Sequence, residues 1–279
     1  MMQLLRLELY KIFRRPRTYI SFGIITAFAI IVQIAMLADG KTFVNFALQG
    51  VSDQFDIQGN VLNGYLVTYI ILQSLLLQIP LLVALVAGDA IAGEANLGTL
   101  RLLLTKPFAR YELILSKFAA SVVYALLLLL WLALVGLFFS LLLFGKGDMI
   151  NMKSGEFILL LKDDILWRYA CAFGFAALAM TTVASLAIML SIFAENAIGP
   201  IMSTMGIIAV LTIFSTLEIP LFDLIKPYLF TSHVIAWKGF FEDPVPYAAI
   251  GRSALVLLVY TIAFIGTTIF VFNRKDIRS

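Results

Sequence analysis

The chain has 279 residues, of which 62% are apolar, 13% are charged and one each is cysteine and histidine, with a net charge of +3. A soluble domain is nearer half apolar and a quarter charged, so the composition predicts an all-α protein that crosses the membrane several times. The positive charge is too weak and too dispersed to suggest nucleic acid, so we expect no nucleic-acid partner, and the lone cysteine and histidine argue against a disulfide or a bound metal.

Residues 2–15 predict a short amphipathic helix that lies in the headgroup layer of the membrane. Apolar residues recur there at helical spacing, and the basic residues lie mainly on other faces: Arg6, Lys11, Arg14 and Arg15. Pro16 is expected to end this helix. A frayed basic leader is the alternative. The next apolar stretch is longer than that of a cleaved signal peptide, so we expect it to stay as the first span.

Six apolar stretches are each long enough for the roughly 20 helical residues that a bilayer requires. We expect them to form a single transmembrane domain over residues 1–279, with spans at about 18–38, 65–87, 113–144, 169–193, 198–217 and 250–272. Only Lys117 and Arg252 carry charge within these stretches, and we expect both side chains to snorkel to an interface. Uncharged polar residues such as Gln33 are expected to hydrogen-bond between helices.

Lysine and arginine are concentrated in the N-terminal segment, in the 88–112 connection and in the C-terminal tail. Since cytoplasmic loops carry the excess of these residues, both termini and the 88–112 connection are expected in the cytoplasm. Residues 218–249 lie on the outer side in this orientation and combine aromatic residues with four prolines. Short re-entrant or interfacial helices fit that composition, and plain aromatic anchoring at the membrane surface is the alternative.

Small residues in the fifth span lie at a spacing that lets a second helix approach closely. They are Gly199, Ser203 and Gly206, and they predict either a dimer seam or packing within one chain. The sequence lacks the nucleotide-binding motif Gly-x-x-x-x-Gly-Lys-[Ser/Thr] and the catalytic motifs His-Glu-x-x-His and Gly-x-Ser-x-Gly. We therefore expect no enzyme and no cofactor in this chain.

Residues 88–110 are the polar, glycine-containing break between the second and third spans. Helical spacing puts Glu94, Gly98 and Arg101 along one stripe, beside an apolar stripe that contains Leu97 and Leu100. Two glycines weaken the helix and favour a bend near residues 96–98, with Thr99 as the cap of the next helical turn. The segment predicts a short charged helix under the membrane, and an amphipathic turn on the headgroups is the alternative.

The same segment resembles the signature of ABC-2-type permeases, the membrane subunits of ABC transporters. The resemblance rests on an acidic residue before a Gly-Thr pair, then leucines, a proline, an arginine and a lysine that opens the third span: Glu94, Gly98-Thr99-Leu100-Arg101-Leu102-Leu103-Leu104, Pro107, Arg110-Tyr111-Glu112 and Ser116-Lys117. The chain departs from the pattern at Ala109, where serine is usual, and at Leu100-Arg101, where an acidic residue often comes after Gly-Thr.

The resemblance implies a permease subunit of an exporter in the cell inner (plasma) membrane, paired with a second permease subunit that is identical or different. A separate cytoplasmic ATPase, which would hold ATP and magnesium, would bind the 88–112 connection as a coupling helix, and an accessory extracytoplasmic protein could join. The residues implied at the ATPase are Glu94, Leu97, Gly98, Thr99, Leu100, Arg101 and Arg110. A stand-alone carrier or channel and a non-transporting structural or immunity protein are the alternatives. The substrate is not specified by the sequence.

Overall fold

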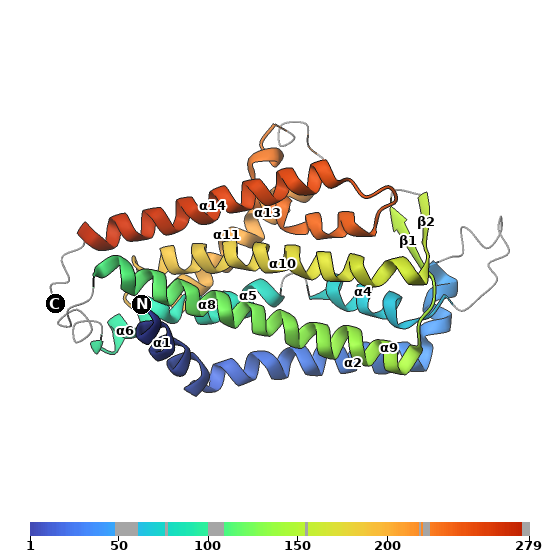
Figure 1. Cartoon of the computed structure of the whole chain (residues 1–279), viewed down its shortest axis with the longest axis horizontal. Helices are drawn as coiled ribbons and strands as arrows, with labels where there is room; N and C mark the ends of the chain where they lie inside the picture. The colour runs from blue at the N-terminus through green and yellow to red at the C-terminus, as the bar shows by residue number, and fades with distance from the viewer. Residues whose placement is uncertain are drawn as a thin grey trace.

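The computed structural model describes residues 1–47, 61–75, 78–99, 109–153, 156–217, 219 and 224–274. Long apolar helices lie side by side in one bundle (Figure 1). Five stretches are long and apolar enough to cross a membrane: Pro16–Val44 within α2 (Pro16–Ala47), Arg110–Phe144, α10 (Lys162–Ser191), α11 (Ile198–Thr216) and α14 (Tyr247–Arg274). The prediction of an α-helical multi-pass membrane protein is therefore confirmed.

The predicted second span is two helices rather than one. It consists of α4 (Gly64–Ser74) and α5 (Gln78–Ala87), which differ in direction by 55° and count as a sixth candidate span only if taken together. Asn63 caps α4, accepting hydrogen bonds from the backbone N–H groups of Tyr65 (3.0 Å) and Leu66 (3.1 Å). Pro80 lacks the N–H that a continuous helix would need, so it fits the first turn of a new helix.

The third span contains a wide turn. Arg110–Phe144 comprises α8 (Arg110–Leu132), the π-helical turn η1 (Ala133–Phe138) and α9 (Phe139–Phe144). Gln33 of α2 donates to the Val135 carbonyl at 2.9 Å, and Thr68 of α4 donates to the Gly136 carbonyl at 3.1 Å. These bonds satisfy carbonyls that the wide turn exposes, and they confirm that Gln33 hydrogen-bonds between helices.

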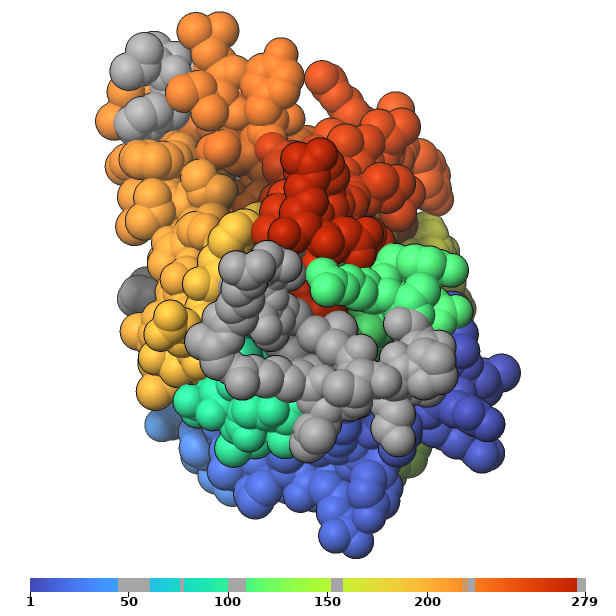
Figure 2. Space-filling model, turned by 90° about the vertical axis from the view of Figure 1, so that its left-hand side faces the viewer, coloured from blue at the N-terminus to red at the C-terminus, as the bar shows by residue number. Residues whose placement is uncertain are grey.

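One end of the bundle carries α1 (Met2–Arg14), α6 (Asp89–Asn96) and the last turn of α14, and we call it the α6 end (Figures 1 and 2). The opposite end carries an antiparallel hairpin of β1 (Met149–Lys153) and β2 (Glu156–Leu160), paired from Met149–Leu160 to Lys153–Glu156. This short hairpin was not predicted from the sequence, and it lies outside the helices of the bundle. Its strands bury Met149 and Leu160, and Asn151 donates to the Phe241 carbonyl at 2.9 Å.

Between α11 and α14 the described residues form three short helices and no span. They are η2 (Lys226–Tyr228), α13 (Phe230–Val234) and η3 (Ile235–Phe241), as expected from the prolines in this segment. Arg168 of α10 donates to the carbonyls of Phe240 (3.0 Å) and Glu242 (2.7 Å), so η3 is fixed to α10. His233 bridges the Ser253 hydroxyl and the Pro227 carbonyl, both at 2.9 Å.

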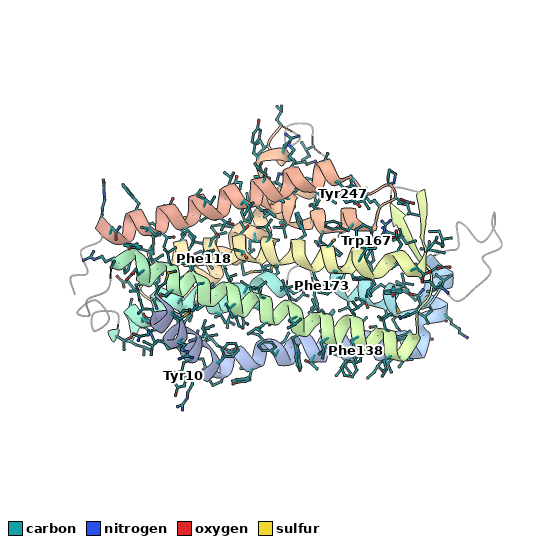
Figure 3. The ribbon with its side chains drawn as sticks, viewed as in Figure 1. Tyr10, Phe118, Phe138, Trp167, Phe173 and Tyr247 are labelled. Carbon is teal, nitrogen blue, oxygen red and sulfur yellow. The ribbon has the colours of Figure 1, made fainter. Side chains whose placement is uncertain are left out.

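The core lies along α10, which packs against α5, α8, α11, α14 and η3. The Thr182 hydroxyl of α10 meets the Thr261 hydroxyl of α14 at 3.0 Å. The outside of the bundle is apolar, with exposed rings such as Phe138 and Tyr247 around its circumference (Figure 3). An apolar exterior around a hydrogen-bonded interior is the arrangement that lipid requires.

The small residues of α11 make no close contact with another helix in the part of the chain that the structure describes. A Cβ atom on Gly206 would meet nothing within 4 Å, and one on Gly199 would meet only Ala194 and Asn196, just before the helix. Ser203 is exposed. The described residues therefore do not support packing within one chain here, and the dimer seam stays a prediction. The close approach to α11 occurs instead at Gly88, where a Cβ atom would lie 3.3 Å from the Ile201 nitrogen.

Candidate functional site

A cluster of charged side chains joins four helices, α1, α2, α6 and α8, at the α6 end, and we call it the charge cluster. It combines four cations with three carboxylates: Glu8 and Lys11 of α1, Arg15 and Arg17 beside the start of α2, Asp89 and Glu94 of α6, and Lys117 of α8. These residues line a common hollow. The three carboxylates and Lys117 are buried, whereas the other three cations are about a third exposed.

Lys117 lies at the centre of the cluster. Its ammonium group is 2.7 Å from the Glu94 carboxylate and 3.1 Å from that of Glu8, and its side chain is fully buried. Lys11 contacts the same two carboxylates, at 2.7 Å from Glu94 and 2.8 Å from Glu8. The expectation that Lys117 snorkels to an interface is wrong, because two buried carboxylates neutralise it inside the bundle.

Asp89 makes the second connection between α6 and the N-terminal helices. Its carboxylate pairs with Arg15 and, at 2.8 Å, with Arg17. A Cβ atom on Gly93 would collide with this carboxylate, so glycine at that position leaves the space that Asp89 occupies. Gly93 therefore has a packing role within α6, and the helix continues past it to Asn96.

A single hydroxyl group ties α6 to α10. Ser191 Oγ donates to the Gly88 carbonyl at 2.6 Å and accepts from the backbone N–H groups of Ala92 (2.8 Å) and Ile91 (3.3 Å). N–H groups in the first turn of a helix have no partner within that helix. Ser191 therefore satisfies the start of α6 from a neighbouring span, as a capping residue would do from its own chain segment.

The electrostatics of the cluster favour the charged form of its members. Burial alone would raise the pKa of the Glu94 carboxyl, but Lys117 and Lys11 outweigh it and hold that pKa below its usual range. Burial would likewise lower the pKa of the Lys11 ammonium, but hydrogen bonds to Glu8 and Glu94 outweigh it and the pKa is raised. The folded protein therefore keeps both groups ionised over a wider pH range than the unfolded chain does.

These directions predict how stability depends on pH. The contribution of Glu94 is present above its ordinary pKa of 4.5 and is lost as the pH falls through its lowered folded value. The contribution of Lys11 is present below 10.5 and is lost as the pH rises through its raised value. We expect the difference in unfolding temperature between wild type and Glu94→Gln to stay constant from about pH 5.5 to 9 and to shrink below pH 4.5. A difference that changes steadily around pH 7 would contradict the network.

The structure divides the residues predicted to contact an ATPase into two groups. Glu94 is buried in the charge cluster, so its carboxylate is not on the surface, and its contact with an ATPase stays a prediction. Leu97 is 67% exposed, and Gly98 and Thr99 are exposed beside it. Gly98 has a φ of +68°, which ends α6 and confirms the predicted break. Leu100 and Arg101 lie outside the described residues.

The predicted basic residues also differ in their surroundings: some contact other helices and some are exposed. Arg110 begins α8 and donates to the carbonyls of Phe272 (3.3 Å) and Asn273 (3.2 Å), which fixes the end of α14. On α1, Arg6 and Arg14 are exposed, and the Arg14 guanidinium lies 5.1 Å from the centre of the Tyr10 ring. Lys11 and Arg15 instead turn inward to the carboxylates, so only part of the predicted headgroup-facing set is free for headgroups.

Sequence reasoning missed Glu8, Arg17, Asp89 and Ser191 as members of the site. The only local signal was the Glu8–Lys11 spacing, which places the two side chains on one helix face. No cluster of three or more histidine, cysteine or acidic residues that could hold a metal ion occurs in the described part of the chain. The arrangement instead connects α6 rigidly to α1, α8 and α10.

A protein-family model described as "Protein of unknown function (DUF2705)" matches residues 24–278. The chain belongs to the DUF2705 family. It is also similar to the "Uncharacterized protein YhcI" of Bacillus subtilis (strain 168), at 24% identity over 199 residues, which are 69% of this chain. The chain spans 63% of the length of that relative. The DUF2705 match begins within α2, after the residues that α1 contributes to the charge cluster.

Proposed function

We propose that this chain is the membrane subunit of an ATP-driven ABC exporter, and that a separate ATPase binds at the exposed end of α6. One observation carries the proposal. The helix α6 is ion-paired to α1 and α8 and hydrogen-bonded to α10, while Leu97 beside it is exposed. A displacement of α6 by a partner would therefore act on three other helices at once. For a partner to change the arrangement of the spans, one element must contact both the partner and the spans, and α6 is such an element.

Two further features support the proposal. The beginning of α1 and the end of α14 lie at the α6 end, as a cytoplasmic location of both termini requires (Figure 1). The sequence has no nucleotide-binding motif of its own, so ATP and magnesium would reside on the partner. The exposed face of α11 with Gly199, Ser203 and Gly206 would meet a second permease subunit, identical or different, in the inner membrane.

Replacement of Leu97 by glutamate tests the ATPase partner. A buried leucine at an interface contributes about 1.5–3 kcal/mol, so Leu97→Glu is expected to weaken ATPase association by ten-fold or more. The measurement is affinity purification of the full chain from its own membranes, with quantification of any co-purifying protein that carries a Gly-x-x-x-x-Gly-Lys-[Ser/Thr] motif. The matched control is Leu161→Glu, which is 63% exposed at the hairpin end.

Three outcomes would contradict the proposal. The first is that no such ATPase accompanies the wild-type chain. The second is that Leu97→Glu and Leu161→Glu retain it equally. The third is that the purified chain hydrolyses ATP without a partner.

The charge cluster favours a second candidate, an ion-coupled carrier that works alone. Buried ionisable groups such as Lys117 and Glu94 are typical of proton and ion pathways, and their burial was not expected from the sequence. In liposomes that contain only this chain, an ion gradient would then drive solute uptake or release, and Lys117→Met would abolish it. The ABC proposal expects no transport by the isolated chain under those conditions.

A further inference from the structure

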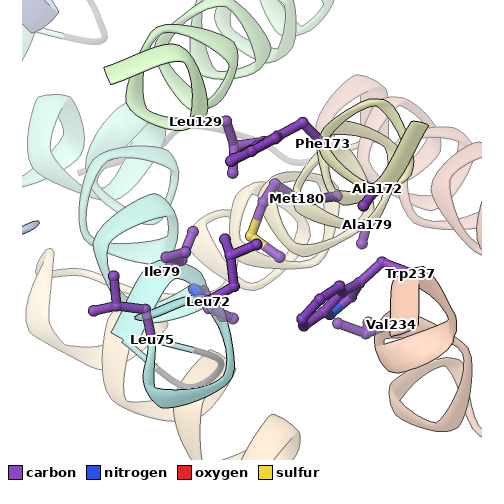
Figure 4. A pocket seen from close by; sticks show the side chains of 12 residues that line it. Leu72, Leu75, Ile79, Leu129, Ala172, Phe173, Ala179, Met180, Val234 and Trp237 are labelled. Atoms are coloured by element: carbon purple, nitrogen blue, oxygen red, sulfur yellow. The ribbon is translucent and has the colours of Figure 1, made fainter. Parts of the chain in front are cut away.

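A hollow lies where α4 ends and α5 begins, and the charge cluster plays no part in it. Its cavity volume is about 50 Å³. Its walls come from six helices and consist of apolar side chains: Leu72, Leu75, Ile79, Pro80, Leu129, Ala172, Phe173, Ala176, Ala179, Met180, Val234 and Trp237. Figure 4 shows Leu72 and Ile79 on one side and Trp237 and Val234 on the other, with Met180 between them.

Lys238 is a basic residue next in sequence to one of the residues that line the hollow. Lys238 comes directly after Trp237, and its ammonium group donates to Gln73, the residue after Leu72, at 3.1 Å. The bond joins the two elements whose side chains face each other across the hollow. Lys238 is half-buried, and no carboxylate lies within 4 Å of it in the part of the chain that the structure describes. Burial lowers the pKa of this ammonium group, and no anionic group among the described residues offsets that effect.

An apolar pocket beside a half-buried cation without an anion has the chemistry of a site for an acidic amphiphile. Ligand pockets are mostly apolar and carry a few polar groups that fix orientation. A carboxylate or phosphate would restore the ion pair that Lys238 lacks, while a hydrocarbon chain would replace the empty volume between α4, α10 and η3.

We propose that this hollow binds the hydrocarbon chain of an acidic amphiphile, a long-chain carboxylate or an acidic phospholipid, whose head group pairs with Lys238. The site does not depend on the ATPase partner proposed above, so it can be tested with the full chain alone. Trp237 forms part of the wall and gives a direct signal, because a bromine atom in contact with the indole quenches its fluorescence.

The experiment uses a variant whose only tryptophan is Trp237 (Trp131→Phe, Trp167→Phe), in nanodiscs of phosphatidylcholine. The probes are a dibrominated long-chain fatty acid, a dibrominated phosphatidylglycerol, the dibrominated alcohol of the same chain length as the fatty acid, and a dibrominated phosphatidylcholine. We expect saturable quenching by one or both acids, and which of them binds identifies the source of the ligand. The affinity should rise about four-fold for each added methylene until the hollow is full.

Two substitutions separate the head-group contact from the cavity. Lys238→Gln is expected to weaken binding of the acids about five-fold and to leave the alcohol unchanged. Lys146→Gln is the matched control, because it removes an exposed lysine at the hairpin end. Ala176→Leu fills the hollow and should abolish saturable quenching by every probe, and Lys238→Gln serves as the test that leaves the packing intact.

The proposal is overturned if both acids quench no more than phosphatidylcholine does, or if the alcohol equals the acids in the wild-type background. It is also overturned if Lys238→Gln binds the acids as tightly as Lys146→Gln. Loss of the ATPase partner would leave all of these results unchanged, so the failure of one proposal can be distinguished from the failure of the other.

Discussion

Replacement of Lys117 by methionine is expected to lower the free energy of unfolding by about 3–5 kcal/mol. The methionine fills the space of the lysine stem, but Glu8 and Glu94 are then left buried with Lys11 as their remaining cation. Removing one partner from a buried ion pair costs this much because the charge left behind is desolvated without compensation. In purified protein the unfolding temperature should fall by about 10 °C.

The control is Lys162→Met, which removes an exposed lysine at the hairpin end and should leave the unfolding temperature within about 1 °C. Substitution of a carboxylate in the same variant shows whether the lost stability comes from the missing charge or from altered packing. Glu8→Gln added to Lys117→Met restores the balance of charges, so the double variant should be more stable than the sum of the two single effects predicts. Equal unfolding temperatures for Lys117→Met and Lys162→Met would show that the cluster does not stabilise this end of the bundle.

Replacement of Gly64 by alanine is the second substitution with a large expected effect. A Cβ atom there would lie 2.6 Å from the Leu141 Cα and 2.7 Å from both the Leu141 nitrogen and the Ser140 carbonyl oxygen. These are backbone atoms, so no side chain can turn aside and the helices α4 and α9 must separate. We expect a loss of about 3 kcal/mol in the free energy of unfolding, the upper range for overpacking.

Gly266→Ala is the matched control within the same fold. Gly266 lies inside α14, and a Cβ atom there would meet nothing within 4 Å. Alanine favours the helix over glycine by about 1 kcal/mol, so this variant should be as stable as the wild type or slightly more so. Denaturant or thermal unfolding of both variants in the same detergent decides the comparison. If Gly64→Ala and Gly266→Ala unfold at the same temperature or denaturant concentration, the close approach of α4 and α9 is excluded.

Hydropathy alone predicted most of the long helices. The stretch expected at 113–144 is the helix Arg110–Phe144, and that expected at 198–217 is Ile198–Thr216. Length and apolar content determine these elements, because a bilayer requires about 20 helical residues. The division of the second stretch into α4 and α5 needed more than hydropathy, since Pro80 is tolerated inside a membrane helix when neighbours satisfy the freed backbone groups.

The charge cluster could not be predicted in the same way. Lys117 is 109 residues from Glu8, and Lys11 is 83 residues from Glu94, so no local spacing relates them. A lysine near the end of an apolar stretch satisfies both the snorkelling and the buried-pair interpretation, and only the position of α1 against α8 decides between them. The same holds for Gly64, whose neighbour Leu141 becomes visible only once two helices are packed.

The wide turn η1 determines the rotational setting of the remainder of the third span. A π-helical turn accommodates a residue that an ordinary α-helix would have to wind into the next turn. If Ala133–Phe138 tightened to α-helical geometry, Phe139–Phe144 would revolve by about 100° and advance by about 1.5 Å relative to α4. Leu141 would then leave its place over Gly64. The hydrogen bonds from Gln33 and Thr68 to these carbonyls thus stabilise the π-helical turn and so fix the rotation of α9 relative to α4.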